Sequence, residues 1–235
     1  MRFDSVIEVL RVGFGRAGAV GTVPDVAGRG ERERLLDLVT AHCLEHGVAD
    51  LTLRRVAADV GTNNRMLLYY FTSKEGLIES ALLHAVGRFP RVVGAIDLLH
   101  DRAAPLEERL ARCWREISHP VNTPFMRLFF EVFGLAAHRP EPFRTYLDRA
   151  GHEWNARVEE VLVAEGLPRP DAALLGREIV ALWRGLQFDL LSSGERDEID
   201  RSHDRAATWI SHRVRRAIGD RAGGGDGDAA AALRE

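Results

Sequence analysis

Apolar residues recur at steps of three and four along most of the chain between residues 31 and 220. Such steps place side chains on one face of an α-helix, which has about 3.6 residues per turn. No segment of useful length alternates apolar and polar residues as a half-buried strand does. The pattern therefore predicts an all-α protein of about nine helices.

Capping residues and helix breakers divide this pattern into separate helices. Thr52 and Ser73 suit N-cap positions, and Gly47 and Gly61 suit helix ends. A long helix is expected from about residue 74 to 99. Further boundaries are marked by Pro105, Pro120, Pro124, Pro140, Pro142, Pro168, Pro170, Ser193 and Gly194.

Both ends of the chain differ from the middle. Residues 1–30 combine a short apolar run with repeated glycines, which predicts a flexible N-terminal arm. Residues 219–235 are mostly glycine, alanine and aspartate, which predicts a disordered tail because there is little to bury.

Composition narrows the class of protein. The 235 residues are 46% hydrophobic with a net charge of −3, which argues against a protein that coats nucleic acid non-specifically. No run approaches the roughly 18 apolar residues of a membrane span, and no secretory signal is visible, so we expect a cytoplasmic protein. Cys43 and Cys113 lack neighbours at metal-ligand spacing and are expected to be buried, reduced thiols. Neither a metal nor a cofactor is predicted.

Three short helices are predicted close together near the N-terminus. Residues 31–46 carry a broad apolar stripe and suit a scaffold helix. A second helix follows Thr52, Gly61 provides a tight corner, and Asn63 caps a third helix. This spacing is typical of a helix-turn-helix unit.

The local charge of this segment favours contact with DNA. Between residues 52 and 74 there are four basic residues, Arg54, Arg55, Arg65 and Lys74, and one acidic residue, Asp59, so the local net charge is +3. In a helix-turn-helix, the start of the second helix enters the major groove, where asparagine pairs with adenine and arginine with guanine. The segment is therefore predicted to bind double-stranded DNA.

The segment GTNNRMLLYYFTSKEGLI at 61–78 resembles the recognition-helix signature of the TetR/AcrR family of transcriptional regulators. A glycine corner, a leucine-aromatic core, a Tyr-Phe pair and a Ser-Lys-Glu helix start follow in that order. The preceding LTLRRVAADVG also matches, so the resemblance covers about 31–85 by motif and the rest by length and helical layout. It implies a helix-turn-helix domain at 31–76 and an effector-binding and dimerisation domain at 77–218.

The resemblance also implies which residues contact DNA. Residues around the start of the third helix would enter the groove, while Lys74 and one of the two tyrosines would contact phosphate. Phe71 would hold the third helix against the first. The family usually has a tyrosine where this chain has Leu68, and Tyr69 is the neighbouring substitute. The complete predicted DNA-binding set is Thr52, Arg54, Arg55, Thr62, Asn63, Asn64, Arg65, Met66, Tyr69, Tyr70 and Lys74.

Aromatic residues gather between residues 106 and 154, which suggests a pocket for a small, largely apolar effector. Plain core packing is the alternative explanation for the same residues. The predicted pocket residues are Trp114, Phe125, Phe129, Phe133, Trp154 and Trp183.

Two long amphipathic helices are predicted at 171–192 and 198–217. The family resemblance implies that two such helices from each subunit form a homodimer interface, and a palindromic operator requires two-fold symmetry. The predicted interface residues are Leu175, Ile179, Leu182, Leu186 and Trp209.

The predicted function is a repressor that its effector releases from a palindromic operator. Three other functions are alternatives to it. Catalysis is not expected, because the HCLEH run at 42–46 is not the HExxH zinc motif and no phosphate-binding loop or nucleophile elbow occurs. An activator of the same family stays open, as does a helical binding protein with a degenerate DNA reader, for which Leu68 is the sequence hint.

Overall fold

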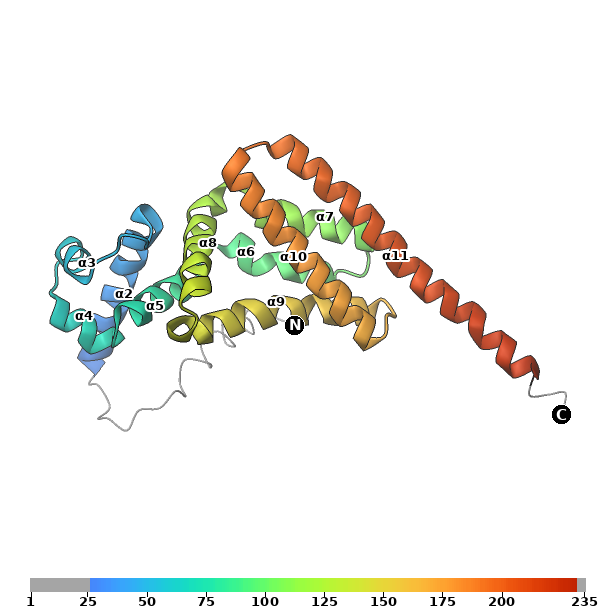
Figure 1. Cartoon of the computed structure of the whole chain (residues 1–235), viewed down its shortest axis with the longest axis horizontal. Coiled ribbons are helices and arrows are strands. Elements are labelled where there is room, and N and C mark those ends of the chain that lie inside the picture. The colour runs from blue at the N-terminus through green and yellow to red at the C-terminus, as the bar shows by residue number, and fades with distance from the viewer. Residues whose placement is uncertain (1–25, 232–235) are drawn as a thin grey trace. The chain divides into compact units, whose positions relative to one another are not determined.

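The computed structural model describes the backbone of residues 26–231 and the side chains of 30–148 and 152–220. Over this range the chain is helical and contains no strand, which confirms the predicted all-α class (Figure 1). The predicted arm lies outside the described residues as far as residue 25, and so do the last four residues of the predicted tail. The α-helices are α2 (Val26–His46), α3 (Leu53–Asp59), α4 (Asn64–Phe71), α5 (Lys74–Val86), α6 (Pro90–Ala95), α7 (Leu106–Ile117), α8 (Thr123–His138), α9 (Arg144–Ala164), α10 (Arg169–Ser193) and α11 (Arg196–Ala231). Three short 3-10 helices are η1 (Ile96–His100), η2 (Pro120–Asn122) and η3 (Glu141–Phe143).

The helix predicted over 74–99 is divided into three pieces. Helix α5 ends at Val86 with Gly87 as its C-cap, α6 begins at Pro90, and η1 completes the segment. Proline has no backbone N–H to give to the preceding turn, so a continuous helix would be interrupted at Pro90. The sequence prediction missed this break because the apolar spacing continues across it.

The backbone is helical at both margins of the described range. Helix α2 begins at Val26, inside the predicted arm, and α11 reaches Ala231 through the stretch for which a disordered tail is predicted. Once a helix has formed, each further residue adds one hydrogen bond within its own backbone, so such extensions need no packing partner.

The described residues form two compact units. Unit 1 comprises residues 26–93 and 121–147, and unit 2 comprises 94–120 and 148–231. In unit 1, α2 packs against α5 and α8, and α4 packs against α3 and α5. Its core includes Leu35, Val39, Val56, Leu67 and Phe71, all of which are buried.

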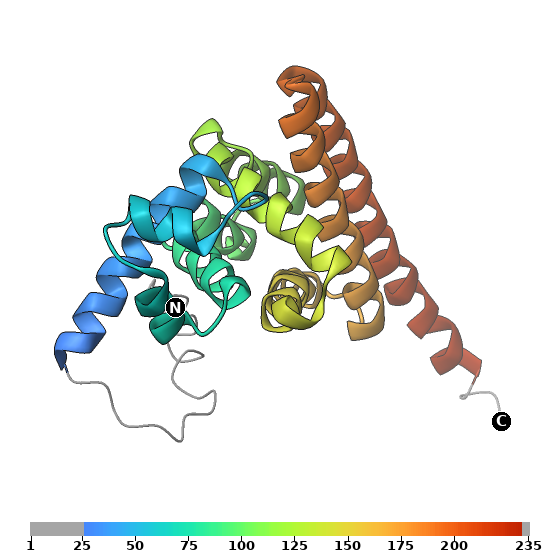
Figure 2. The same cartoon turned by 60° about the vertical axis from the view of Figure 1, so that its left-hand side comes forward.

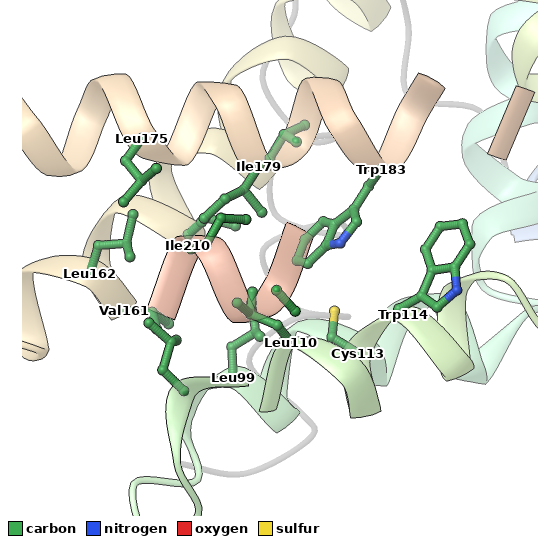
Figure 3. Close-up of a cluster of buried hydrophobic side chains, with 14 of the residues drawn as sticks. Leu99, Leu110, Cys113, Trp114, Val161, Leu162, Leu175, Ile179, Trp183 and Ile210 are labelled. Carbon is green, nitrogen blue, oxygen red and sulfur yellow. The ribbon is translucent and has the colours of Figure 1, made fainter. Parts of the chain in front are cut away.

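Unit 2 has the longer helices and a continuous apolar core. Helices α10 and α11 run side by side, as two views of the chain show (Figures 1 and 2). Figure 3 shows core side chains from η1, α7, α9, α10 and α11 pointing toward one another. The labelled side chains are Leu99, Leu110, Cys113, Trp114, Val161, Leu162, Leu175, Ile179, Trp183 and Ile210.

One charged group lies within this core. Arg109 of α7 is 2% exposed, and it donates to the carbonyl oxygen of Leu99 at 2.6 Å and to the carboxylate of Glu165 at 2.6 Å. These partners compensate for the loss of water around the two terminal nitrogens of the guanidinium group, whereas its Nε is buried without a hydrogen-bond partner among the described residues. None of the described helices combines the length and the apolar character that a membrane span requires.

Candidate DNA-binding surface

The predicted caps fix the start of each short helix in unit 1. The hydroxyl of Thr52 accepts the N–H of Arg55 at 3.3 Å, and the side chain of Asn63 accepts the N–H of Met66 at 3.1 Å. The hydroxyl of Ser73 accepts the N–H of Gly76 at 2.9 Å. Each cap satisfies a backbone donor that the first turn of a helix leaves without an intrahelical partner, so local sequence sets these three boundaries.

The corner between α3 and α4 depends on Gly61. Its φ of +71° is in the left-handed region, which L residues with a side chain rarely adopt. The next N–H, that of Thr62, is donated to the carbonyl oxygen of Ala57 at 2.8 Å and closes the end of α3. Two residues later α4 begins, so the helix-turn-helix predicted from the spacing is present in the structure.

Helix α4 has a buried back and an exposed front. Leu67 and Phe71 are buried in unit 1, and the guanidinium of Arg32 on α2 lies 5.2 Å from the centre of the Phe71 ring. Phe71 therefore contacts the first helix, as the family resemblance implies. Asn64 and Arg65 are exposed in the first turn of the helix. This places amide and guanidinium groups where a major groove would receive them.

Leu68 lies on the exposed front of α4. It is 42% exposed and lies one turn after Asn64, so an apolar side chain faces outward where the family usually has tyrosine. Tyr69 is 70% exposed, and its ring centre lies 4.9 Å from that of the half-buried Tyr70. Tyr69 is thus the more accessible of the two tyrosines.

The remaining members of the predicted DNA-binding set lie around this front. Thr52, Arg54, Arg55 and Asn63 are exposed, while Thr62, Met66 and Lys74 are half-buried. All belong to one compact segment of unit 1, although contact with DNA by each of them stays a prediction.

Charged pairs connect the scaffold helix α2 to its neighbours. Asp37 receives hydrogen bonds from His84 at 2.7 Å and Arg88 at 2.8 Å, and these bonds lower the pKa of its carboxyl group. The imidazole of His42 lies 3.2 Å from the carboxylate of Asp59 on α3, and burial lowers the pKa of His42. These contacts fix α3 and α5 against α2.

The two cysteines are buried, and the two histidines of the HCLEH run contact each other. Cys43 and Cys113 are buried free thiols, and burial raises the pKa of Cys43 to about 12 and also raises that of Cys113. The rings of His42 and His46 are 4.7 Å apart in an edge-to-face arrangement. Within the described ranges, no group of three or more His, Cys, Asp or Glu side chains could hold a metal ion.

The predicted pocket residues fall into two groups, one in each unit. On α8 in unit 1, the ring centres of Phe125 and Phe129 are 6.2 Å apart, those of Phe129 and Phe133 are 5.1 Å apart, and Tyr146 lies beside the last two. In unit 2, Trp154 meets Trp183 edge to face with ring centres 6.1 Å apart. A role for either group in binding an effector stays a prediction.

Two surface hollows of unit 2 are formed by other residues. One, of about 440 Å³, lies between α7 and α11. The other, of about 260 Å³, lies between α9 and α10 and carries mostly basic and amide groups. The first is lined by Pro105, Glu107, Glu108, Ala111, Arg115, Asp204 and Ala207, and the second by His152, Asn155, Arg177, Val180, Ala181 and Arg184.

The predicted dimer residues require a correction. Leu175 and Ile179 are each 1% exposed because they face the core of their own subunit, so they are not available to a partner. Leu182 and Leu186 are half-buried against the same core, whereas Trp209 is 58% exposed. The large apolar residues that α10 leaves exposed are instead Leu174, at 63%, and Phe188, at 58%. Apolar spacing located the helix but did not identify which face a second subunit could reach.

His203 on α11 was not singled out from the sequence. It is 1% exposed, stacks on Trp114 with ring centres 5.0 Å apart, and accepts the indole N–H of Trp183 at 3.2 Å. Burial lowers its pKa, although Asp204 and Asp200 act in the opposite direction. Its place in the stripe of Ile199, Ala207, Ile210 and Val214 is the signal that could have revealed it.

The fold and this surface together define a helix-turn-helix protein with an additional helical unit. The family described as "Bacterial regulatory proteins, tetR family" matches residues 40–81, which cover the end of α2, all of α3 and α4, and the first part of α5. The chain is 25% identical over 194 residues to the HTH-type transcriptional regulator BetI 1 of Chromohalobacter salexigens, covering 79% of this chain and 92% of that protein. It is 24% identical over 159 residues to BetI of Serratia proteamaculans, covering 66% and 78%.

Solved structures give the same result over a larger part of the chain. The multidrug binding protein EbrR, crystallised with imidazole, matches with a TM-score of 0.62 and 25% identity over 83% of this chain and 97% of EbrR. EbrR with ethidium matches with a TM-score of 0.61 and 25% identity over 80% and 99%. Residues 40–81 therefore form a DNA-binding domain of the TetR type, and most of the chain is similar to helix-turn-helix transcriptional regulators.

Proposed function

We propose that this regulator is a homodimeric repressor that binds a palindromic operator and is released by a small, largely apolar molecule. The observation that carries the proposal is the exposed start of α4, where Asn63, Asn64 and Arg65 face outward from a buried back. Such a protein would act in the cytoplasm, where the bacterial chromosome lies.

Different residues of the surface would have different roles in binding. The amide of Asn64 and the guanidinium of Arg65 suit base edges, so they would set sequence preference. Arg54 and Lys74 lie outside the start of α4 and suit phosphate contacts, which add affinity for any sequence.

A second subunit is required to read both halves of a palindrome, and α10 and α11 offer a surface for it. Leu174, Phe188 and Trp209 are exposed apolar side chains of these two helices. Between the first two, Ala181 and Gly185 are exposed small residues on α10 that would permit close approach of another helix. Exposed apolar patches of this kind commonly mark protein interfaces.

The effector proposed here is apolar and aromatic in character. The phenylalanines of α8 and the tryptophans of unit 2 supply aromatic surface within the chain. Support also comes from EbrR, which was crystallised with the aromatic compounds ethidium and proflavin. Binding of such a compound would alter the separation of the two α4 helices, which a palindrome fixes at about one DNA turn.

The first experiment is selection of bound sequences from random duplex DNA, followed by titration of the selected duplex at several salt concentrations. We expect a palindrome of two half-sites. Arg65→Ala should relax base preference with a loss of about 1–3 kcal/mol on the selected site. Lys74→Ala should weaken binding to all sequences and reduce the salt slope by about one unit.

Arg102→Ala is the matched control, because Arg102 is an exposed arginine of unit 2 that lies before α7, outside the proposed surfaces. It should leave affinity and sequence preference unchanged. Equal, salt-independent effects of Arg65→Ala and Lys74→Ala would count against the assigned roles. If no sequence is enriched, the DNA reader is degenerate.

A further inference from the structure

A carboxylate on α8 holds the turn that leads into the DNA-reading helices. The side chain of Glu131 accepts the N–H of Val48 at 2.8 Å and the N–H of Ala49 at 2.6 Å. Glu131 lies 83 residues beyond Val48 in sequence, and both belong to unit 1. The contact therefore joins a distant helix to the connection between α2 and α3.

The backbone of the turn is shaped around this carboxylate. Gly47 has a φ of +73°, and a Cβ atom at this position would lie 2.6 Å from one carboxylate oxygen of Glu131 and 3.0 Å from the other. Only glycine combines this backbone conformation with the space that the carboxylate occupies. The close approach shows that Glu131 is fitted against the main chain.

The side chains of Val48 and Leu51 anchor this turn in the core, and Glu131 holds its backbone. Helix α2 ends at His46 and α3 begins at Leu53, so six residues connect them. The N–H of Gly47 is donated to the carbonyl oxygen of Cys43 and continues the end of α2, whereas the next two N–H groups point to Glu131. Two hydrogen bonds to one charged acceptor restrain both position and orientation.

We propose that Glu131 is a positioning residue for the DNA reader, which sets the orientation of α3 and α4 by holding the α2–α3 turn against α8. Thr52, the N-cap of α3, follows Ala49 by three residues, so displacement of the turn displaces the start of α3. The inference rests on the proposed DNA-binding function of α4.

The test compares three variants with the unmodified full-length chain. Glu131→Ala removes both acceptors, Glu131→Gln keeps one acceptor and the shape, and Glu141→Ala removes an exposed carboxylate of the same unit as a control. Each is measured for affinity to the selected duplex, for amide exchange at Val48 and Ala49, and for Tm. Affinities are compared at a temperature at which every variant is fully folded.

We expect Glu131→Ala to weaken DNA binding about tenfold, because hydrogen bonds to a charged group are each worth about one order of magnitude or more in an equilibrium constant. Glu131→Gln should show a smaller loss of about threefold, and Glu141→Ala none. Amide exchange at Val48 and Ala49 should be faster in Glu131→Gln than in the unmodified chain, and fastest in Glu131→Ala. The N–H of Gly47 should keep its protection in both variants. Dependence of affinity on Glu131 in fully folded protein is the result that a purely stabilising role would not produce.

Unchanged affinity in Glu131→Ala, with a lowered Tm, would overturn the inference and leave Glu131 as a residue that only stabilises the fold. If the unmodified chain binds no duplex, the proposed function fails instead. In that case amide exchange along α3 and α4 tests the positioning role without DNA. Faster exchange in Glu131→Ala would support this role, and unchanged protection would overturn it.

A second pair of variants tests the contact if Glu131→Ala folds poorly. Gly47→Ala should lower Tm more in the unmodified background than in Glu131→Gln, because the more weakly held amide can move away from the added methyl group. An equal Tm loss in both backgrounds would show that backbone strain alone makes Gly47 necessary, and would contradict the fitted contact.

Discussion

The polar contacts inside unit 1 differ in kind from those inside unit 2. In unit 1, three carboxylates near solvent connect α2 to its neighbours. Asp37 on α2 pairs with His84 on α5, and Asp59 on α3 pairs with His42 on α2. Glu131 on α8 accepts hydrogen bonds from the turn that follows α2. In unit 2, polar groups lie inside an apolar core, as Arg109 and His203 do. Exposed charged contacts contribute little free energy each, whereas buried ones are costly to break. The comparison indicates that breaking a buried polar contact of unit 2 should cost more free energy than breaking an exposed charged contact of unit 1.

The largest expected effect is removal of a core aromatic from unit 2. Trp183→Ala should destabilise the protein by about 3–5 kcal/mol, because it leaves a cavity and removes a donor to His203. Urea unfolding measures the change. Val121→Ala, at an exposed position, is the control and should cost less than about 1 kcal/mol. Similar losses in the two variants would contradict the assignment of Trp183 to the core.

The next effect compares a buried with an exposed arginine. Arg109→Ala leaves Glu165 and the carbonyl of Leu99 without their partner in the core, and should cost about 3 kcal/mol. Arg88→Ala in unit 1 breaks a partly exposed pair with Asp37 and should cost about 1 kcal/mol or less. Denaturant unfolding of both variants checks the difference, and equal losses would remove the contrast between the units.

Acid should act on His203 of unit 2, and on His42 of unit 1, in a higher pH range than on Asp37 of unit 1. For His203, burial lowers the pKa below its ordinary value of 6.5, so the unfolded chain takes up a proton that the folded chain resists. Above about pH 6.5 this residue makes no difference, and as pH falls below that value stability is lost by up to about 1.4 kcal/mol per pH unit. His203→Gln should flatten the dependence of Tm on pH between 6.5 and 5. An unchanged profile would contradict the assignment.

A carboxylate of unit 1, Asp37, responds at lower pH, because hydrogen bonds from His84 and Arg88 lower its pKa from the ordinary value of 3.8. The stabilisation is fully present above that value and is lost as pH falls through the lower folded pKa. Asp37→Asn should therefore reduce stability at neutral pH, by about 1 kcal/mol since the group is largely exposed, and should reduce the loss at strongly acidic pH. Comparison of its acid unfolding with that of His203→Gln separates the two transitions. A variant that loses no stability at neutral pH would contradict the role of this contact.

The smallest expected effect is a gain at the DNA surface. Leu68→Tyr restores a hydroxyl on the outward face of α4 and should strengthen DNA binding by about threefold, the value of one modest hydrogen bond. Titration with the selected duplex measures it. Weaker binding would show that Leu68 itself contacts the DNA, for example through a thymine methyl group.

Much of unit 1 could be predicted because its features are local. The caps Thr52, Asn63 and Ser73 each accept the N–H three residues away, and the left-handed corner at Gly61 needs only that one residue. The order of these features was enough to predict the helix-turn-helix. The break at Pro90 was also visible in principle, because proline interrupts a helix whatever lies around it.

The sequence by itself therefore determined the helical class, the helix-turn-helix and the outward face of α4. Only the tertiary structure decided that Leu175 and Ile179 face their own core, that His203 lies between two tryptophans, and that Glu131 meets the α2–α3 turn. The physical reason is the sequence separation over which each interaction acts. Caps and turns act between residues close together in the chain, whereas burial and long-range hydrogen bonds depend on which segments fold beside one another, which apolar spacing does not specify.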